Sequence, residues 1–442
     1  MMKTTDQITK NFILTNIRLI SMDQDVGYLV KASFSVHEGV ISKVYSENEI
    51  PDQLDSDLPQ IDGKGYIAMP GFVDTHTHMW NSPWKSFLGT ATGLSYEALC
   101  RKMGPLFTPE DSYAAVYAAS LEALSAGVTT MNNWAHNLPS PEHADAELQA
   151  MEDAGLRGQF TYGYHYELSP EEPMNVADAI RLRDSSASKR MTFRLGLRND
   201  VTADPDFPFF KFLNVTPALL KQEIAMAREA RLPISMHVLN EGNAEYYAKA
   251  GYLNSDNLII HDYHWDDADW KVLADHQTPV SFSPSTANGM RKIIPLTSAQ
   301  KNGVQCGLSF DNYAGSGGPN MFKMMAAARI NQQLGKKKIS DNNLLSLVTK
   351  DGAGVLGISN DVGTITPGKQ ADFMLVKTDS LAMAPAKDSV RALTNTANPS
   401  DIDSVYMDGT PVKRNGKMLG IHTADIANDL NSRFERLIRL MN

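Results

Sequence analysis

The sequence predicts a mixed α/β protein: a (β/α)8 barrel of the TIM type, joined to a small β-sandwich domain built from both termini. Three observations support this prediction. Short apolar runs alternate with helical segments through the middle of the chain, which is typical of βαβ units. Strand-like segments occur at both ends of the chain. The length of 442 residues also fits, because α/β barrels often run long as a single unit.

The small domain is predicted from strand-like apolar runs, separated by polar turns, near both termini. These runs lie at residues 12–14, 40–44, 363–376 and 402–418. We therefore expect residues 1–66 and 363–422 to meet in one composite β domain, with the barrel over residues 67–362. Apolar residues recur at helical spacing near the end of the chain, which predicts an amphipathic helix over residues 423–442.

The barrel is predicted from eight apolar runs that have the length of buried strands. They lie at residues 66–73, 128–132, 157–164, 191–197, 232–238, 258–261, 279–283 and 304–310. Helical stretches lie between many of them, for example over residues 108–125 and 217–230. The first of these helices has a clear start. Thr108 can cap the helix, Pro109 suits its first turn, and the negative charge of Glu110 is favourable near the positive end of the helix dipole.

Composition excludes several classes of protein. The formal net charge of −10 gives no bulk attraction to nucleic acid or anionic lipid. Cys100 and Cys306 are the only cysteines, too few for a disulfide framework or a cysteine-rich zinc module. The N-terminal residues lack the apolar core of a secretory signal, and no stretch approaches the roughly 20 apolar residues of a membrane span. We expect a cytoplasmic protein that can form a homo-oligomer, either a dimer or a tetramer. Its expected partner is a small-molecule substrate and not nucleic acid or a membrane.

A pair of histidines follows the first predicted barrel strand, in the segment PGFVDTHTH at residues 70–78. Residues two apart on a strand point to the same side, so His76 and His78 can present two imidazoles together. Neutral imidazole is the commonest nitrogen ligand of metal ions in proteins. A His-x-His pair alone is more often two unrelated surface histidines, so the other strand ends decide the interpretation.

Polar residues mark the ends of three further apolar runs. His237 and His261 each lie at the end of a run, and Asp311 directly follows one. The carboxyl ends of the strands carry the active sites of barrel enzymes. Burying these side chains without a partner would be costly, whereas one metal ion satisfies them together. The alternative is that each is hydrogen-bonded separately.

With these motifs the chain resembles the amidohydrolase superfamily. The resemblance is to the metal-dependent group of this superfamily. It is carried by the segment quoted above, by MH at the fifth strand, by IIH at the sixth and by SFD at the eighth. That group holds triazine hydrolases and the guanine, cytosine, S-adenosylhomocysteine and methylthioadenosine deaminases. The run VGTITPGKQADF at residues 362–373 resembles the group's return into its small β domain. The resemblance spans nearly the whole chain and is more specific for fold and metal site than for substrate.

The resemblance implies four metal ligands: His76, His78, His237 and Asp311. It also implies catalytic roles, for His261 beside the nucleophile or substrate and for Asp311 as proton acceptor. The binuclear branch adds a carboxylated lysine at the end of the fourth strand, but residues 191–200 contain no lysine. We therefore expect one divalent metal ion. Zn2+ is the leading candidate because the ligands are mostly imidazole, with Fe2+ or Mn2+ as alternatives.

These residues predict a hydrolase that attacks a carbon–nitrogen bond other than a peptide bond through a metal-bound hydroxide. The metal would lower the pKa of its water to about 7. Asp311 would take the proton and pass it to the leaving nitrogen, while His261 would polarise the attacked carbon. The expected substrate is a small cyclic amide or nitrogen heterocycle. The alternatives are an aminohydrolase of a purine, pyrimidine or triazine, a lactone or ester hydrolase, and a catalytically dead scaffold of the same fold.

One departure from the group bears on the substrate. Its deaminases carry a glutamate three residues after the fifth-strand histidine, whereas this chain has Asn240 there and Glu241 next. An amide cannot shuttle a proton. We therefore expect poor activity on aminopurines and aminopyrimidines and a preference for an already electrophilic carbonyl carbon, unless Glu241 takes over the shuttle.

Further candidates for contact with the substrate lie after other strands. They are Trp80, Trp84, Trp134, His165, Asn240, His264 and Asn312. The tryptophans follow the first two strands, where they could wall a pocket, and ordinary packing is the alternative. For His165 and His264 a structural role is the alternative. Asn312 begins a glycine-rich loop that permits close approach to a ligand or forms a plain turn.

Overall fold

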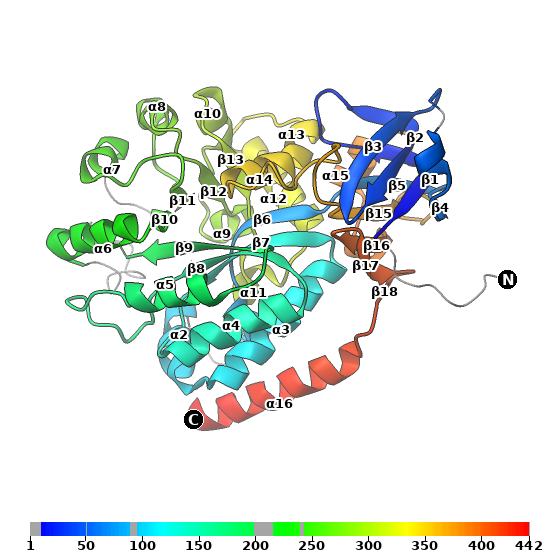
Figure 1. Cartoon of the computed structure of the whole chain (residues 1–442). Helices are drawn as coiled ribbons and strands as arrows, with labels where there is room; N and C mark the ends of the chain where they lie inside the picture. The colour runs from blue at the N-terminus through cyan, green and yellow to red at the C-terminus, as the bar shows by residue number, and fades with distance from the viewer. Residues whose placement is uncertain (1–9, 50, 89–94, 199–214, 239–242, 442) are drawn as a thin grey trace.

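The structure contains the predicted barrel (Figure 1). This computed structural model describes residues 10–49, 51–88, 95–198, 215–238 and 243–441. All pairings in the barrel sheet are parallel. Its strands, in spatial order, are β13 (Cys306–Leu308), β12 (Val280–Phe282), β11 (Leu258–His261), β10 (Ile234–Val238), β9 (Met191–Leu197), β8 (Arg157–Tyr162), β7 (Val128–Ala135), β6 (Phe72–His78) and β14 (Asp311–Asn312).

The barrel closes between its first and last strands. β14 pairs with β6, and only residues 309–310 separate β14 from β13. The Thr75 hydroxyl on β6 also lies 3.0 Å from the carbonyl oxygen of Leu308 on β13, to which it donates. The segment after β13 therefore brings Asp311 next to the histidines of β6.

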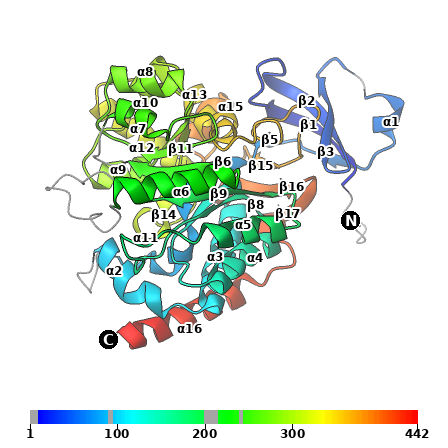
Figure 2. The same ribbon diagram turned by 60° about the vertical axis from the view of Figure 1, so that its left-hand side comes forward.

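Helices cover the outside of the barrel (Figures 1 and 2). The longer ones are α3 (Pro109–Ser125), α4 (Pro141–Asp153), α5 (Val176–Ser185), α6 (Pro217–Glu229), α8 (Asp267–Asp275) and α12 (Met321–Leu334). Shorter ones include α2 (Tyr96–Met103), α7 (Ala244–Ala250), α9 (Pro284–Gly289), α10 (Leu296–Lys301), α11 (Tyr313–Ser316), α13 (Asp341–Leu347), α14 (Lys350–Val355) and α15 (Ser389–Asn395). The predicted start of α3 is confirmed, because Thr108 and Asp111 form a capping box that satisfies backbone donors the helix leaves free.

The second sheet joins the two ends of the chain, as predicted. Its strands, in order, are β18 (Lys417–Met418), β17 (Thr410–Arg414), β16 (Ile402–Met407), β15 (Phe373–Lys377), β5 (Tyr66–Pro70), β1 (Phe12–Ile20), β2 (Tyr28–His37) and β3 (Val40–Ser46), with β4 (Gln60–Asp62) paired to β1. The rings of Phe34 on β2 and Phe373 on β15 lie 5.1 Å apart. A flat sheet would place these strands about 14 Å apart, so the sheet is strongly curled around its own core.

The first predicted strand, residues 66–73, is divided in the structure. β5 belongs to the small sheet, and β6 begins after Gly71 in the barrel. A Cβ atom at Gly71 would lie 2.1 Å from the hydroxyl oxygen of Thr129, so only glycine fits where the chain crosses between the sheets. The sequence does not indicate this division, because both strands are buried and together form one continuous apolar run.

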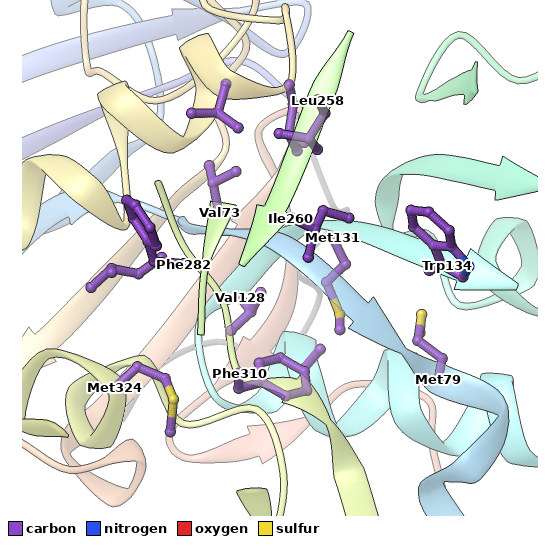
Figure 3. Close-up of a cluster of buried hydrophobic side chains, with 14 of the residues drawn as sticks. Val73, Met79, Val128, Met131, Trp134, Leu258, Ile260, Phe282, Phe310 and Met324 are labelled. Atoms are coloured by element: carbon purple, nitrogen blue, oxygen red, sulfur yellow. The ribbon is translucent and has the colours of Figure 1, made fainter. Parts of the chain in front are cut away.

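Apolar side chains from several barrel strands meet in one buried cluster (Figure 3). Those labelled include Val73, Val128, Met131, Trp134, Leu258, Ile260, Phe282 and Phe310. They come from β6, β7, β11 and β12 and from the segment between β13 and β14. Ile234, Met236 and Val238 of β10 belong to the same cluster, so one core joins the strands whose ends carry the predicted ligands.

The predicted C-terminal helix is α16 (Thr423–Met441), which lies against α3 (Figure 1). Arg433 and Arg436 both form ion pairs with Asp111 at the start of α3. The side chain of Leu437 is buried, and the ring of Phe434 contacts that of Phe87. Within the described parts of the chain, no helix is long and apolar enough to cross a membrane.

Candidate metal centre

The ends of four strands bring the predicted ligands to one mouth of the barrel. His76 and His78 lie at the end of β6, His237 lies on β10, His261 ends β11 and Asp311 begins β14. Because all pairings are parallel, these positions share the edge that carries active sites in barrel enzymes. The two β6 rings lie 4.7 Å apart, as expected for residues that share one side of a strand.

The donor atoms of these residues converge. Asp311 Oδ1 lies 3.3 Å from His76 Nε2 and 3.5 Å from His78 Nε2. The Nε2 atoms of His76 and His237 are 3.1 Å apart. Two overlapping groups, one of His76, His78 and Asp311 and one of His76, His237 and His261, each have donor atoms within 4.8 Å of one another. This spacing allows one small cation to contact several of them at once.

The protonation states suit a cation. Burial lowers the pKa of His78 and of His237 well below the usual value, so both imidazoles are neutral near pH 7 and keep a lone pair. Burial alone would raise the pKa of Asp311, but the interaction with His76 and the electrostatic influence of the neighbouring His261 and His78 hold it below its usual range. Neutral imidazoles and an ionised carboxylate are a donor set that zinc favours. The residues present therefore fit a divalent metal ion.

The backbone orients His78 toward the centre. Its Nδ1 lies 3.1 Å from the carbonyl oxygen of Trp134. A carbonyl can only accept, so Nδ1 carries the hydrogen and Nε2 has the lone pair that faces Asp311. Such a partner behind a ligand histidine commonly sets its tautomer and ring orientation.

Two residues of the centre have a strained backbone. His261 has φ 76° and Asp311 has φ 68°, both in the left-handed region. Non-glycine residues adopt this region at a cost on the order of 1–3 kcal/mol, and such strain concentrates at functional sites. Both strands therefore turn sharply at the residues whose side chains enter the centre.

The second oxygen of Asp311 is held from the other side. The hydroxyl of Thr286, on α9, donates to Oδ2 at 2.5 Å, and the amide nitrogen of Asn312 donates to the same oxygen at 3.2 Å. The side-chain oxygen Oδ1 of Asn312 also accepts the backbone N–H of Gly315 at 2.6 Å, which caps α11. Asn312, predicted to contact the substrate, thus lies beside the centre with its side chain bound to Asp311 and to the loop.

The ring of His261 lies close to the rings of two other histidines of the centre. Its ring centroid is 5.6 Å from that of His76 and 5.3 Å from that of His237, and it stacks on Tyr263 at 5.9 Å. Burial lowers the pKa of His261 to about 4, so it is neutral near pH 7. A neutral imidazole in this place can bind a metal or donate a hydrogen bond to a reacting group.

The three predicted wall tryptophans have fully buried side chains. Trp80 donates its indole hydrogen to His136 Nδ1 at 3.1 Å, and Trp84 donates to the sulfur of Met103 at 3.1 Å. The ring of Trp134 packs against the histidines of the centre. All three are therefore built into the core around the centre.

The remaining predicted contacts are dispersed. His165 is partly buried after β8, burial lowers its pKa, and its Nδ1 has no hydrogen-bond partner among the described residues. His264 is exposed, with its Nε2 3.0 Å from Lys292 Nζ. Asn240 lies outside the described residues.

His136 belongs to the site and was missed in the sequence. Its ring centroid lies 4.2 Å from that of His78, and its Nε2 lies 3.0 Å from the hydroxyl oxygen of Tyr166. Burial lowers the pKa of His136 to about 3, so its ring is neutral near pH 7 and does not take up a second proton. The predicted strand at 128–132 stops short, whereas β7 continues to Ala135 and places His136 at a strand end. Extending the predicted strand to residue 135 would have placed His136 at its end, beside the other candidate residues.

The family match and the relatives given below show that the chain is a hydrolase that acts on carbon–nitrogen bonds other than peptide bonds. The model of the amidohydrolase family matches residues 67–412. The chain belongs to the amidohydrolase family, whose members generally depend on a metal ion.

Curated relatives match over nearly the full length. A 5-methylthioadenosine/S-adenosylhomocysteine deaminase of Desulforudis audaxviator is 27% identical, covering 91% of this chain and 94% of the relative. A 5'-deoxyadenosine deaminase of Methanothermobacter thermautotrophicus is 26% identical, covering 89% of this chain and 92% of the relative.

Solved structures share the fold. An adenosine deaminase from Xanthomonas campestris with bound zinc has a TM-score of 0.81 at 18% identity, covering 97% of this chain and 99% of that one. Atrazine chlorohydrolase from Arthrobacter aurescens, in complex with zinc, has a TM-score of 0.82 at 18% identity, covering 96% of this chain and 100% of that one.

Proposed function

We propose that this protein is a zinc-dependent hydrolase that cleaves a carbon–nitrogen bond of a small cyclic amide or nitrogen heterocycle. The observation that carries the proposal is the convergence of three histidines and one ionised aspartate: His76, His78, His237 and Asp311. Zinc is supported by the mostly imidazole donor set and by the zinc present in two structures of the same fold.

The residues around the centre divide the chemistry. A zinc ion held by the four ligands would supply a nucleophilic water near pH 7 by lowering its pKa. Asp311 is ionised, so it can accept the proton of the attacking water and then pass this proton to the leaving nitrogen. Thr286 and Asn312 hold Asp311 by Oδ2, which fixes the direction of its carboxylate. His261 is neutral and can donate a hydrogen bond to the oxygen on which charge develops.

The position of Asn240 supports an amide-like substrate. In the resembling deaminases this place holds a glutamate that moves a proton to a ring nitrogen, which makes the ring carbon easier to attack. An amide side chain cannot do this. An amide or imide carbonyl carbon needs no such help, because it is already electrophilic.

A second candidate is deamination of an adenine nucleoside. It is favoured by the curated relatives, which are named as deaminases of 5-methylthioadenosine, S-adenosylhomocysteine or 5'-deoxyadenosine. In that case Glu241, the neighbour of Asn240, would have to act as the proton shuttle. Adjacent strand residues face opposite sides, so this needs a bulge or the end of the strand before it.

A substrate panel separates the two candidates. The zinc-loaded parent, Asn240→Ala and Glu241→Gln would be assayed with cyclic amides and imides and with 5'-deoxyadenosine and S-adenosylhomocysteine, by ammonia release and absorbance. Asp311→Asn serves as the inactive control, with an expected loss of about 10²–10⁴-fold in kcat.

The amide proposal predicts that kcat/KM for at least one cyclic amide exceeds that for both nucleosides by about a hundredfold. Efficient deamination by the parent that is lost in Glu241→Gln and kept in Asn240→Ala would overturn it in favour of the second candidate. Full activity of Asp311→Asn on any substrate would reject the centre itself.

A further inference from the structure

Trp134, near the end of β7, contacts all three histidine ligands of the proposed centre. Its ring centroid lies 4.2 Å from that of His237, 5.7 Å from that of His76 and 6.5 Å from that of His78. Its carbonyl oxygen also accepts the Nδ1 hydrogen of His78 at 3.1 Å. One residue thus contacts ligands from two strands, through its ring and through its backbone.

The indole has room there because two glycines face it. A Cβ atom at Gly196 on β9 would lie 2.9 Å from the ring carbons Cε2 and Cζ2 of Trp134 and 3.0 Å from Cγ2 of Thr161. One at Gly163 would lie 3.1 Å from Nε1 of Trp134 and 2.5 Å from the carbonyl oxygen of Ala135. The indole is rigid and fully buried, so it could not yield to a new methyl group without moving against its other neighbours. Those neighbours include the rings of His76 and His237.

The indole N–H is unusual, because it has no hydrogen-bond partner among the described residues. A buried donor without a partner destabilises the folded state. A smaller aromatic ring would avoid this cost but would not fill the same space. The size of the ring, and not its N–H group, therefore accounts for the place of Trp134 in the site.

We propose that Trp134 is a positioning residue that sets the ring orientations of His76 and His237 for metal binding, with Gly196 as the position that leaves room for the indole. This inference rests on the metal centre of the proposed function. In this proposal Trp134 supports the metal ligands, whereas the sequence predicted that it contacts the substrate. Residues that orient metal ligands typically change metal affinity about 10–100-fold when they are replaced.

The test compares Trp134→Leu, Gly196→Ala and the double variant with the parent. Each protein is prepared without metal and titrated with Co2+, whose visible absorption spectrum reports the geometry of its ligands, and Zn2+ affinity is measured by competition with a chelator. Thermal unfolding of each metal-free protein controls for the fold. Trp134→Leu keeps the backbone carbonyl, so it tests the ring alone.

Gly158→Ala is the matched control for the glycine variant. Gly158 is also a barrel-strand glycine, on β8, but a Cβ atom there would meet the flexible Met151 side chain at 2.4 Å. This variant should lower the unfolding temperature of the metal-free protein and leave the Co2+ spectrum and the metal affinity unchanged.

We expect Trp134→Leu and Gly196→Ala each to weaken metal affinity about 10–100-fold and to alter the Co2+ spectrum. In the Trp134→Leu background, Gly196→Ala should have a smaller further effect, because the indole that it would displace is gone and only the Thr161 methyl group remains close. Parental affinity and spectrum in Trp134→Leu, or equal effects of Gly196→Ala in both backgrounds, would overturn the inference. A parent that binds no Co2+ or Zn2+ would instead reject the proposed function.

Discussion

The hydroxyl of Thr286 donates to Oδ2 of Asp311 at 2.5 Å, on the carboxylate oxygen opposite to the one that faces His76 and His78. Thr286 lies on the short helix α9, directly after β12, whereas Asp311 lies on β14. The contact therefore links the element after β12 to the proposed proton acceptor. Hydrogen bonds to charged groups are worth about 1.5–3 kcal/mol, enough to influence both the orientation and the basicity of the carboxylate.

Replacing Thr286 should therefore affect turnover more than metal binding. Thr286→Val keeps the shape of the side chain but removes the donor, and we expect kcat to fall by about tenfold or more. Thr286→Ser, which keeps the hydroxyl, should stay close to the parent. The measurement is steady-state kinetics on zinc-loaded protein with metal content determined in parallel. A valine variant as active as the parent would show that the contact is only structural.

His261 and His237 should differ in what their loss removes. His237→Asn should empty the centre, because it deletes one of the proposed ligands. His261→Asn should lower turnover by about 10²–10⁴-fold and keep most of the metal, as expected for a catalytic group that is not a ligand. Elemental analysis and activity of both variants check this. Loss of the metal from His261→Asn would make His261 a ligand, which its place beside His76 and His237 also permits.

The centre should hold close to one divalent ion per chain. The predicted fourth-strand segment contains no lysine to bridge a second ion, and β9, which spans Met191–Leu197, has none. Elemental analysis after reconstitution with zinc checks the number. Removal of the ion with a chelator should abolish activity, and addition of zinc should restore it. Two ions per chain, or none after reconstitution, would contradict the prediction.

Glu147 should make stability depend on pH. One oxygen of this fully buried carboxyl accepts a hydrogen bond from Asn133 at 2.9 Å, and the other has no partner within the described structure. Burial raises its pKa from the usual 4.5 to about 8. Between these two values the folded protein keeps a proton that the unfolded chain has lost. The stability that arises from the raised pKa of Glu147 is therefore fully present below pH 4.5 and declines as the pH rises toward 8.

Glu147→Gln removes this titration while keeping the shape of the side chain. The free energy of unfolding of the variant, relative to the parent, should therefore increase from pH 5 to pH 8, with a slope of up to about 1.4 kcal/mol per pH unit. Urea unfolding at pH 5, 6.5 and 8 measures it. An equal difference between the two proteins at all three pH values would show that Glu147 is ionised in the folded protein.

The histidines and the aspartate of the centre could be found in the sequence because each stands at the end of a short apolar run. A buried strand in a parallel barrel has a local signature, and its carboxyl end is a defined place in the fold. His136 escaped because the apolar run before it ends at Asn132, whereas pairing with β8 extends β7 to Ala135. Thr286 escaped because nothing in its neighbourhood along the chain indicates a carboxylate 25 residues away.

The barrel, the sheet that joins both termini, and the histidines and aspartate that converge at the centre could all be predicted from the sequence, because apolar periodicity and residue type are local properties. Two features became visible only in the folded chain: β5 and β6 belong to different sheets on either side of Gly71, and Trp134 packs among the histidines of the centre and not on an open wall. These outcomes depend on strand register and on the space left by glycines on neighbouring strands. Both are set by contacts between segments far apart in the chain, which no local pattern records.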